Sequence, residues 1–163
     1  MPQLLLMRHG KAVERNSTPD RERPLTPRGR RDSEAIGPVI ARDYRPDRIL
    51  CSPALRTRET LDALLPALGP NRDVVFLEEL YDPPGDYGDV IAANAGQAKR
   101  LLVIGHNPAA QETAIGLMAA GDARLRGMIH DKFPTSAVAV IDLTANWPDI
   151  QPLAGKLVAF LMP

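Results

Sequence analysis

Residues 4–10, LLLMRHG, contain a short apolar run that ends abruptly at a charged pair and a glycine. Such a run, bounded by turn residues, predicts a strand that is buried on both faces. Similar runs occur in RILCSP at 48–53, VVFLEE at 74–79 and LLVIGHNP at 101–108. Strands that are apolar on both faces are typical of parallel sheets that helices cover on each side. These stretches therefore indicate an α/β fold.

The segments between these strands carry helix signals. Thr26 can cap a helix that has Pro27 at its first position and runs to about Tyr44, with Gly37-Pro38 inside it as a candidate kink. A second helix is expected from about residue 54, and Pro66 is expected to close its regular part. Further helices are expected at about 86–95 and 107–120.

Two more strands, at 136–141 and 156–161, have no helix between them, which predicts an antiparallel pair at the edge of the sheet. The expected fold is a three-layer α/β/α sandwich with a mixed, mostly parallel sheet of about six strands. No repeat, low-complexity segment or linker interrupts the chain. Its 163 residues, 44% of them hydrophobic, suit one domain over 1–163.

Composition and charge argue against some classes of partner for this chain. The 20 Lys and Arg residues balance 20 Asp and Glu, so we expect neither nucleic acid nor a membrane surface as a partner. The single cysteine cannot form an intrachain disulfide, and no apolar stretch approaches the roughly 18 residues of a membrane span. Without a signal-peptide pattern, a cytoplasmic location is expected. The basic segment 1–31 suits either a solvated loop or a site for a small anion.

The carboxyl ends of the predicted strands carry the residues with useful chemistry. In an open α/β sheet, ligands bind at these ends. They present Arg8 and His9, then Arg56, then Glu79, and finally His106. Guanidinium groups bind phosphoryl oxygens through paired hydrogen bonds, a histidine can act as a nucleophile, and a glutamate can protonate a leaving group. The set therefore predicts phosphoryl chemistry at one site.

These motifs resemble those of a known family. MRHGKA at 7–12, SPALRTRET at 52–60 and IGHNP at 104–108 are similar to the histidine phosphatases, the superfamily that includes cofactor-dependent phosphoglycerate mutase. RPLTPRG at 23–29 and FPTSAVAVI at 133–141, together with the short chain, look like its phosphohistidine phosphatase (SixA-type) branch. The resemblance runs from residue 4 to about 141 and implies a phosphoglycerate mutase-like fold, in agreement with the expected strands.

Carried over residue by residue, the resemblance implies that His9 is the nucleophile and becomes transiently phosphorylated. Arg8, Arg56 and His106 correspond to the groups that bind the phosphoryl oxygens. Glu79 falls where larger relatives place the acid that protonates the leaving group. Three nearby carboxylates compete with it for that role: Glu78, Asp82 and Asp86.

The reaction sets requirements for both histidines. His9 must attack as a neutral imidazole, so its other ring nitrogen is expected to donate to a backbone carbonyl or a carboxylate. Arg8, Arg56 and a protonated His106 are expected to surround the equatorial oxygens with positive charge. Neither HxH nor HxxxH spacing occurs, so we expect no metal site and no cofactor.

Other polar residues near the motifs have simpler interpretations. Cys51 lies in a strand pattern and is expected to be a small buried apolar residue. His130 has no motif around it and is expected to be structural. Ser52 is expected at a turn or cap, and Thr135-Ser136 at the start of a strand, with hydrogen bonds to the site left open for both.

Three functions fit these residues. Short connections predict an open groove that admits a phosphorylated side chain of another protein, and an imidazole that is protonated leaves without a strong acid. Protein phosphohistidine is therefore the expected substrate of a phosphatase, with a small phosphomonoester or phosphoanhydride as the alternative. A non-catalytic module that binds phosphorylated proteins is the third reading, and the intact pairs of arginines and histidines speak against it.

Overall fold

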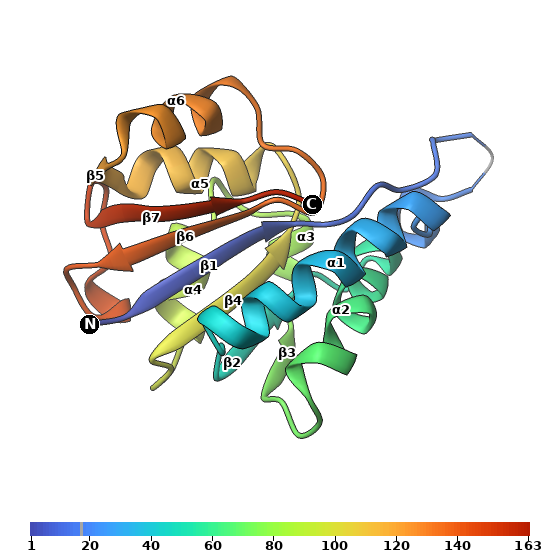
Figure 1. Cartoon of the computed structure of the whole chain (residues 1–163), viewed down its shortest axis with the longest axis horizontal. Helices are drawn as coiled ribbons and strands as arrows, with labels where there is room; N and C mark the ends of the chain where they lie inside the picture. The colour runs from blue at the N-terminus through green and yellow to red at the C-terminus, as the bar shows by residue number, and fades with distance from the viewer. Residues whose placement is uncertain (17) are drawn as a thin grey trace.

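The computed structural model describes residues 1–16 and 18–163, and a seven-stranded sheet forms its centre (Figure 1). The strands lie in the order β3-β2-β4-β1-β6-β7-β5. Of the strands described, only β6 runs antiparallel to its neighbours β1 and β7. In chain order the strands are β1 (Gln3–Arg8), β2 (Arg48–Cys51), β3 (Val74–Phe76), β4 (Arg100–Gly105), β5 (Met118–Gly121), β6 (Val138–Leu143) and β7 (Gly155–Leu161).

Helices cover both faces of this sheet (Figure 1). The α-helices are α1 (Pro27–Asp43), α2 (Leu55–Leu68), α3 (Glu78–Tyr81), α4 (Gly88–Asn94), α5 (Ala109–Leu117) and α6 (Ala123–Asp131), and the 3-10 helices are η1 (Asp20–Glu22) and η2 (Trp147–Asp149). On one face α1 and α2 contribute residues such as Ile40 and Leu64 to the core. On the other face α3 to α6 contribute residues such as Leu80, Ile91 and Ile129. The predicted three-layer arrangement around a mixed, mostly parallel sheet is confirmed.

β1 lies between β4 and β6, inside the sheet, because its side chains are apolar on both faces. Residues 4–7 have no solvent exposure and alternate between the two cores. Burying each such side chain contributes on the order of 1.5–3 kcal/mol. Arg8 pairs with Gly105 at the carboxyl end of β4. The core therefore supports the point where Arg8 and His9 leave the sheet.

The connection from β1 folds back against the start of α1. Gly10 donates its backbone N–H to Thr60 Oγ1 (2.9 Å), and Thr26 donates its backbone N–H to Lys11 O (2.8 Å). Thr26 also caps α1 as predicted, since its hydroxyl accepts a hydrogen bond from Gly29 N (3.0 Å). A Cβ at Gly29 would lie 2.1 Å from Lys11 O, so this close approach requires glycine. The backbone that follows β1 is thereby anchored to α1 and α2.

The region after β4 differs from the prediction. The helix expected to about residue 120 ends at Leu117, because residues 118–121 form β5 and pair in parallel with β7. β5, rather than the last two strands, therefore lies at the edge of the sheet. α6 is also absent from the prediction, although Asp122 caps it by accepting hydrogen bonds from two backbone N–H groups. The segment MAAG has no strand pattern of its own, and pairing with β7 makes it a strand.

Two prolines lie inside helices without ending them. α1 continues through Pro38 to Asp43, and α2 continues through Pro66 to Leu68. The stop expected at Pro66 is therefore wrong. Residues 78–81 form the short helix α3, which the sequence pattern does not predict. These differences leave the predicted order of strands and helices around the site unchanged.

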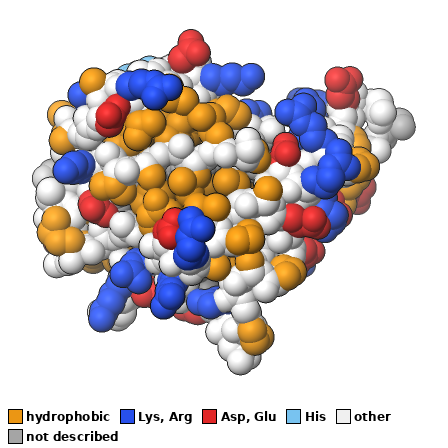
Figure 2. All heavy atoms as spheres, in the orientation of Figure 1, with side chains coloured by type: hydrophobic (Ala, Val, Ile, Leu, Met, Phe, Trp, Pro, Cys, Tyr) orange, Lys and Arg blue, Asp and Glu red, His pale blue; other side chains and the backbone are white. Residues whose placement is uncertain are grey.

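Figure 2 shows that apolar and charged side chains gather in different places on this face of the molecule. Hydrophobic side chains lie over β6 and β7, which α1 and α2 leave uncovered. Lys and Arg side chains lie along the start of α1 and the loop before it. No helix in the described part of the chain is long and apolar enough to cross a membrane.

Candidate active site

His9 follows the last residue of β1 and is only 8% exposed. Its Nδ1 lies 2.7 Å from the carbonyl oxygen of Gly10, and because a carbonyl only accepts, Nδ1 carries the proton. Nε2 therefore keeps its lone pair. Burial lowers the pKa of His9 to about 4, and the charges of Arg56 and Arg8 act in the same direction. The predicted neutral imidazole with a backbone carbonyl as its partner is confirmed.

Arg8 and Arg56 reach the same place from β1 and α2. Arg8 Nη1 donates to the carbonyl oxygen of Phe133 (2.9 Å). Arg56 donates from Nη1 to the carbonyl oxygen of Asp20 (2.8 Å) and from Nη2 to its carboxylate (3.1 Å). The Nε atoms of both arginines are buried and have no hydrogen-bond partner among the described residues. An unpaired buried donor costs about 1–3 kcal/mol, so each Nε is a candidate contact for an anion.

His106 follows β4 and is 9% exposed. Its Nε2 lies 2.7 Å from Ser52 Oγ, so the hydrogen bond left open for Ser52 is present. Its Nδ1 is buried and has no partner among the residues described. The ring centroid lies 5.2 Å from that of His9 and 5.5 Å from that of Tyr81, which meets the imidazole edge-on. His106 thus presents one free ring nitrogen close to the nucleophile.

His106 is neutral in the free protein, and the expectation of a protonated His106 beside a bound phosphoryl group stays a prediction. Burial lowers the pKa of His106 to about 3, and the nearby His9 and Arg56 lower it further, so the ring is neutral at pH 7. A neutral ring can still donate from Nδ1. Ser52 Oγ already accepts a hydrogen bond from Ala54 N (3.4 Å), so its own proton is available for His106 Nε2.

These four side chains line one pocket of about 270 Å³ at the carboxyl ends of β1 and β4, which we call the carboxyl-end pocket. Thr135, for which a contact with the site is left open by the sequence, also lines it. Of the described residues around this pocket, none is acidic and five are cationic. The cations are Arg8, Lys11, Arg15, Arg23 and Arg56. Such a pocket suits a small anion held by guanidinium groups.

Three residues beside these groups are absent from the predicted site. Asp20 accepts hydrogen bonds from Arg56 Nη2 (3.1 Å), Arg23 Nε (3.1 Å) and the hydroxyl of Tyr81 (2.6 Å). Arg23 begins the RPLTPRG motif, which is a usable signal. Asp20 and Tyr81 lie in short segments without periodicity, and only the fold brings them together.

A model of the histidine phosphatase superfamily (branch 1) matches residues 4–90. The chain belongs to this superfamily. The match includes the pocket residues Arg8, His9 and Arg56 of this histidine phosphatase, while His106 lies beyond it. An uncharacterised protein of Mycobacterium tuberculosis is 34% identical to it over 161 residues, which cover 96% of this chain and 99% of that protein.

Solved structures of similar proteins agree with the family over the whole chain. A crystal structure provisionally assigned as the phosphohistidine phosphatase SixA from Agrobacterium tumefaciens matches with a TM-score of 0.81 and 29% identity, covering 100% of this chain and 99% of that one. A structure of the protein histidine phosphatase SixA complexed with tungstate matches with a TM-score of 0.77 and 27% identity, covering 98% and 96%. The fold of this histidine phosphatase is phosphoglycerate mutase-like, and its family supports phosphatase activity.

Glu79 of this histidine phosphatase lies outside the carboxyl-end pocket. Its side chain is exposed on α3 and does not line the pocket. The competing Glu78 forms an ion pair with Arg21, and Asp86 accepts a hydrogen bond from Gly88 N (2.8 Å). Within the described residues, no carboxylate of this segment lines the pocket. The role of Glu79 as the leaving-group acid stays a prediction.

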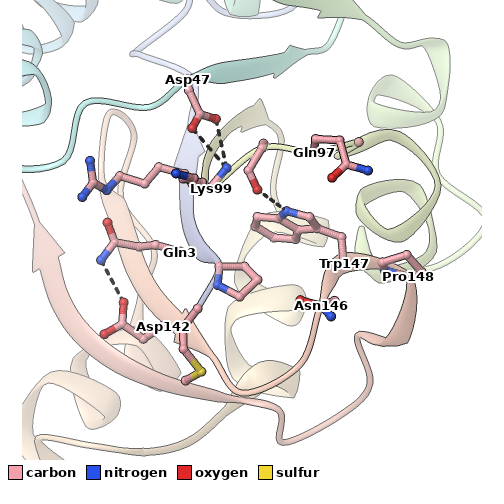
Figure 3. A pocket seen from close by; sticks show the side chains of 13 residues that line it. Gln3, Asp47, Gln97, Lys99, Asp142, Asn146, Trp147 and Pro148 are labelled. Atoms are coloured by element: carbon pink, nitrogen blue, oxygen red, sulfur yellow. Dashed lines mark hydrogen bonds between the residues drawn. The ribbon is translucent and has the colours of Figure 1, made fainter.

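A larger cavity of about 880 Å³ lies at the opposite end of the sheet (Figure 3). We call it the amino-end cavity, because Gln3, Asp47 and Lys99, at or next to the amino ends of β1, β2 and β4, line it together with Trp147 of η2. Its polar groups bond to one another: Gln3 Nε2 donates to Asp142 (2.8 Å), and Trp147 Nε1 donates to Ala98 O (2.6 Å). Among its described lining residues, no buried side-chain polar atom lacks a partner.

The other candidates from the sequence lie apart from the pocket. Cys51 has no solvent exposure, and burial raises the pKa of its thiol, so it is a core residue as predicted. His130 is exposed in the last turn of α6. Among the residues that the structure describes, no group of three or more His, Cys, Asp and Glu side chains is placed to hold a metal ion.

Proposed function

We propose that this protein removes the phosphoryl group from phosphohistidine on a partner protein, by way of a phosphohistidine formed on His9. One observation carries the proposal: three buried donors without partners among the described residues surround the pocket beside the lone pair of His9 Nε2. They are Arg8 Nε, Arg56 Nε and His106 Nδ1. A tetrahedral phosphoryl group offers oxygen acceptors to all three, which compensates the cost of burying them.

In the first step the lone pair of His9 Nε2 attacks phosphorus, and the bond from phosphorus to the leaving nitrogen breaks. The proton on His9 Nδ1 stays hydrogen-bonded to the carbonyl oxygen of Gly10. Arg8 and Arg56 face the negative charge that spreads over the equatorial oxygens, which is the main source of catalysis in phosphoryl transfer. The bound phosphoryl anion also raises the pKa of His106, because a negative charge favours the protonated ring.

In the second step a water molecule attacks the phosphorus carried by His9. The bond from phosphorus to Nε2 breaks and returns the lone pair to the imidazole. The water loses one proton to solvent or to the departing phosphate, and inorganic phosphate leaves. The hydrogen bond from Nδ1 to Gly10 O again fixes which nitrogen is free for the next turnover.

The leaving group supports phosphohistidine as the substrate. An imidazole that is already protonated on its distal nitrogen departs as a neutral molecule and needs no strong acid, whereas an alkoxide does. The exposed position of Glu79 suits the first kind of leaving group. The similarity to SixA structures along nearly the whole chain supports the same substrate class. Because strands from Gln3 to Leu161 share the sheet that carries the pocket, we also propose that 1–163 act as one domain.

The test measures kcat/KM of the purified protein on a phosphohistidine-bearing protein domain, on sugar and nucleotide phosphates, and on a generic aryl phosphate. We expect the highest kcat/KM on the protein domain. With the aryl phosphate we also expect an initial burst of the released phenol, equal in amount to the enzyme, if hydrolysis of phosphorylated His9 is slower than its formation. A matched control is the same domain phosphorylated on serine, whose leaving group requires an acid.

Two other results of these assays would contradict the proposed function and favour another one. Higher kcat/KM on the sugar or nucleotide phosphates would favour the small-molecule phosphatase. Binding of the phosphorylated domain without turnover of any substrate would favour a non-catalytic module. Either outcome is read directly from the same set of reactions.

A further inference from the structure

Asp20 on η1 is surrounded by groups of the carboxyl-end pocket and its neighbours. The hydroxyl of Tyr81 lies 2.6 Å from Oδ2, Arg23 Nε lies 3.1 Å from Oδ1, and Arg15 Nε lies 3.2 Å from Oδ1. The hydrogen bond from Tyr81, followed by those from Arg23 and Arg56, holds the pKa of Asp20 well below its ordinary value. Asp20 is therefore an anion at neutral pH and not a proton donor.

Asp20 binds Arg56 through one particular edge of the guanidinium group. Nη1 donates to the carbonyl oxygen of Asp20 (2.8 Å), and Nη2 donates to Oδ2 (3.1 Å). A guanidinium group offers two edges for bidentate binding, one with both Nη atoms and one with Nε and Nη2. Asp20 occupies the first edge with two of its own oxygens. The second edge includes Nε, which is buried and has no partner among the described residues.

We propose that Asp20 is a positioning residue, which holds Arg56 by its two Nη atoms so that the edge with Nε meets the phosphoryl oxygens. This inference rests on the proposed function, because it assigns the phosphoryl group to the carboxyl-end pocket. The same carboxylate binds Arg23, which also lines the pocket. It further binds the hydroxyl of Tyr81, whose ring packs against His106. One residue of a short 3-10 helix thus connects four side chains around the site: Arg15, Arg23, Arg56 and Tyr81.

Removal of the Asp20 carboxylate should change the affinity for an anion in one direction if Asp20 positions Arg56, and in the other direction if it acts only through its charge. A carboxylate near a phosphate site repels the anion, so by charge alone its removal would tighten anion binding. If Asp20 holds the edge of Arg56 in place, its removal weakens binding instead, because the guanidinium group loses its orientation. The two explanations therefore predict changes in opposite directions.

The first experiment measures tungstate binding by calorimetry for wild type, Asp20→Ala and Asp20→Asn. We expect the Kd to rise about 10- to 100-fold in Asp20→Ala, the size of one lost charge-assisted contact. Asp20→Asn should lie in between, because it keeps one side-chain acceptor. The control Asp43→Asn removes an exposed carboxylate that pairs with Arg42 and not with Arg56, and it should leave the Kd unchanged. Equal or tighter binding by Asp20→Ala would overturn the proposal.

The second experiment tests whether Asp20 acts through Arg56. We expect Asp20→Ala to change tungstate binding by less than about twofold when Arg56→Ala is already present, because the two changes affect one interaction. Undiminished weakening in that background would overturn the proposal. Nitrogen NMR gives a readout independent of stability: on adding tungstate, the Arg56 Nε–H signal should shift in wild type and shift less in Asp20→Asn. Circular dichroism confirms that each variant is folded.

These measurements distinguish the two proposals. A wild-type protein that binds tungstate, loses that binding in Asp20→Ala and hydrolyses no substrate would contradict the proposed activity but not the role of Asp20. A wild-type protein that hydrolyses phosphohistidine, with Asp20→Ala unaffected in Kd and kcat, would contradict the role of Asp20 alone. Failure of the wild type to bind tungstate at all would contradict both.

Discussion

The carboxyl-end pocket and the amino-end cavity lie at opposite ends of the same strands, and they differ in how their polar groups are bonded. The amino-end cavity has a volume of about 880 Å³ and the carboxyl-end pocket about 270 Å³. In the larger one, polar side chains such as Gln3 and Trp147 are bonded within the protein. In the smaller one, buried nitrogens of Arg8, Arg56 and His106 have no partner among the described residues. We therefore base the proposal that a ligand binds at the carboxyl end on these unpaired donors and not on volume.

The charge of the two ends differs for the same reason. The amino-end cavity contains both acids and bases, among them Asp47, Lys99 and Asp142. The lining of the carboxyl-end pocket, as far as the structure describes it, is cationic only. Among the described residues, Asp20 is the one carboxylate that pairs with these cations, so a surplus of positive charge remains that favours the binding of an anion. Changes at the two ends should therefore have separate effects.

The largest expected effect is that of His9→Ala. Because His9 Nε2 supplies the attacking lone pair in the proposed reaction, we expect kcat to fall by about 10⁶ when it is removed, as for a lost nucleophile. The assay is hydrolysis of the phosphohistidine-bearing domain, with tungstate binding as a check that the pocket is intact. The matched control at the amino end is Asp142→Asn, which should keep wild-type kcat. An active His9→Ala enzyme would refute the proposed chemistry.

A smaller loss is expected for Arg56→Ala. Removal of one group that stabilises the charge of the transition state should lower kcat by about 10²–10³ and leave a measurable rate. Arg72→Ala is a suitable control, since Arg72 also has a buried Nε without a described partner but donates to the backbone carbonyl groups of Pro46 and Leu68 and does not line the pocket. Wild-type kcat in Arg56→Ala would exclude Arg56 from the phosphoryl site.

Much of the fold can be predicted from the sequence because β1, β2 and β4 are buried on both faces. A continuous apolar run is then the signal, and the residues at its carboxyl end mark the site. Arg8, His9 and His106 are found in this way, and Arg56 follows from the turn after β2. β5 lacks such a signal, since the small residues of MAAG become a strand only by pairing with β7.

The missed parts of the site depend on contacts between distant segments. Asp20 meets Arg56 and Tyr81 across 36 and 61 positions of the chain. Nothing in the local pattern around Asp20 indicates either contact. The charge of His106 is also a property of the folded state, because burial lowers its pKa and no sequence pattern measures burial directly. The site residues that follow strand ends can thus be predicted from the sequence, whereas the residues that orient them, such as Asp20, cannot.

A third and smaller effect is expected in the pH dependence of the protonation of His9. Burial lowers the pKa of His9 to about 4, below the ordinary 6.5, so the nucleophile remains unprotonated as the pH falls from 8 to about 5. At pH 6 an imidazole with the ordinary pKa would be mostly protonated, which would reduce the reactive fraction about fourfold. We expect NMR titration of the free protein to give a midpoint for His9 near 4.

The control for the NMR titration of His9 is a variant that removes a nearby charge. Arg56→Ala removes a positive charge that lowers the pKa of His9, so the midpoint should move upward. The amino-end variant Asp142→Asn should leave it in place. A midpoint near 6.5 in the wild type would mean that His9 is hydrated and not enclosed as described.

The smallest effect on catalysis is expected at the amino end, for Trp147→Phe. Trp147 is 3% exposed and donates from Nε1 to the carbonyl oxygen of Ala98 (2.6 Å), so the change removes one hydrogen bond and part of a buried ring. The free energy of unfolding should fall by about 1–3 kcal/mol, measured by urea denaturation. Turnover and tungstate Kd should stay at wild-type values, because every group that faces the anion lies at the other end of the sheet. Lost turnover in a variant that remains folded under the assay conditions would show that the two ends are coupled.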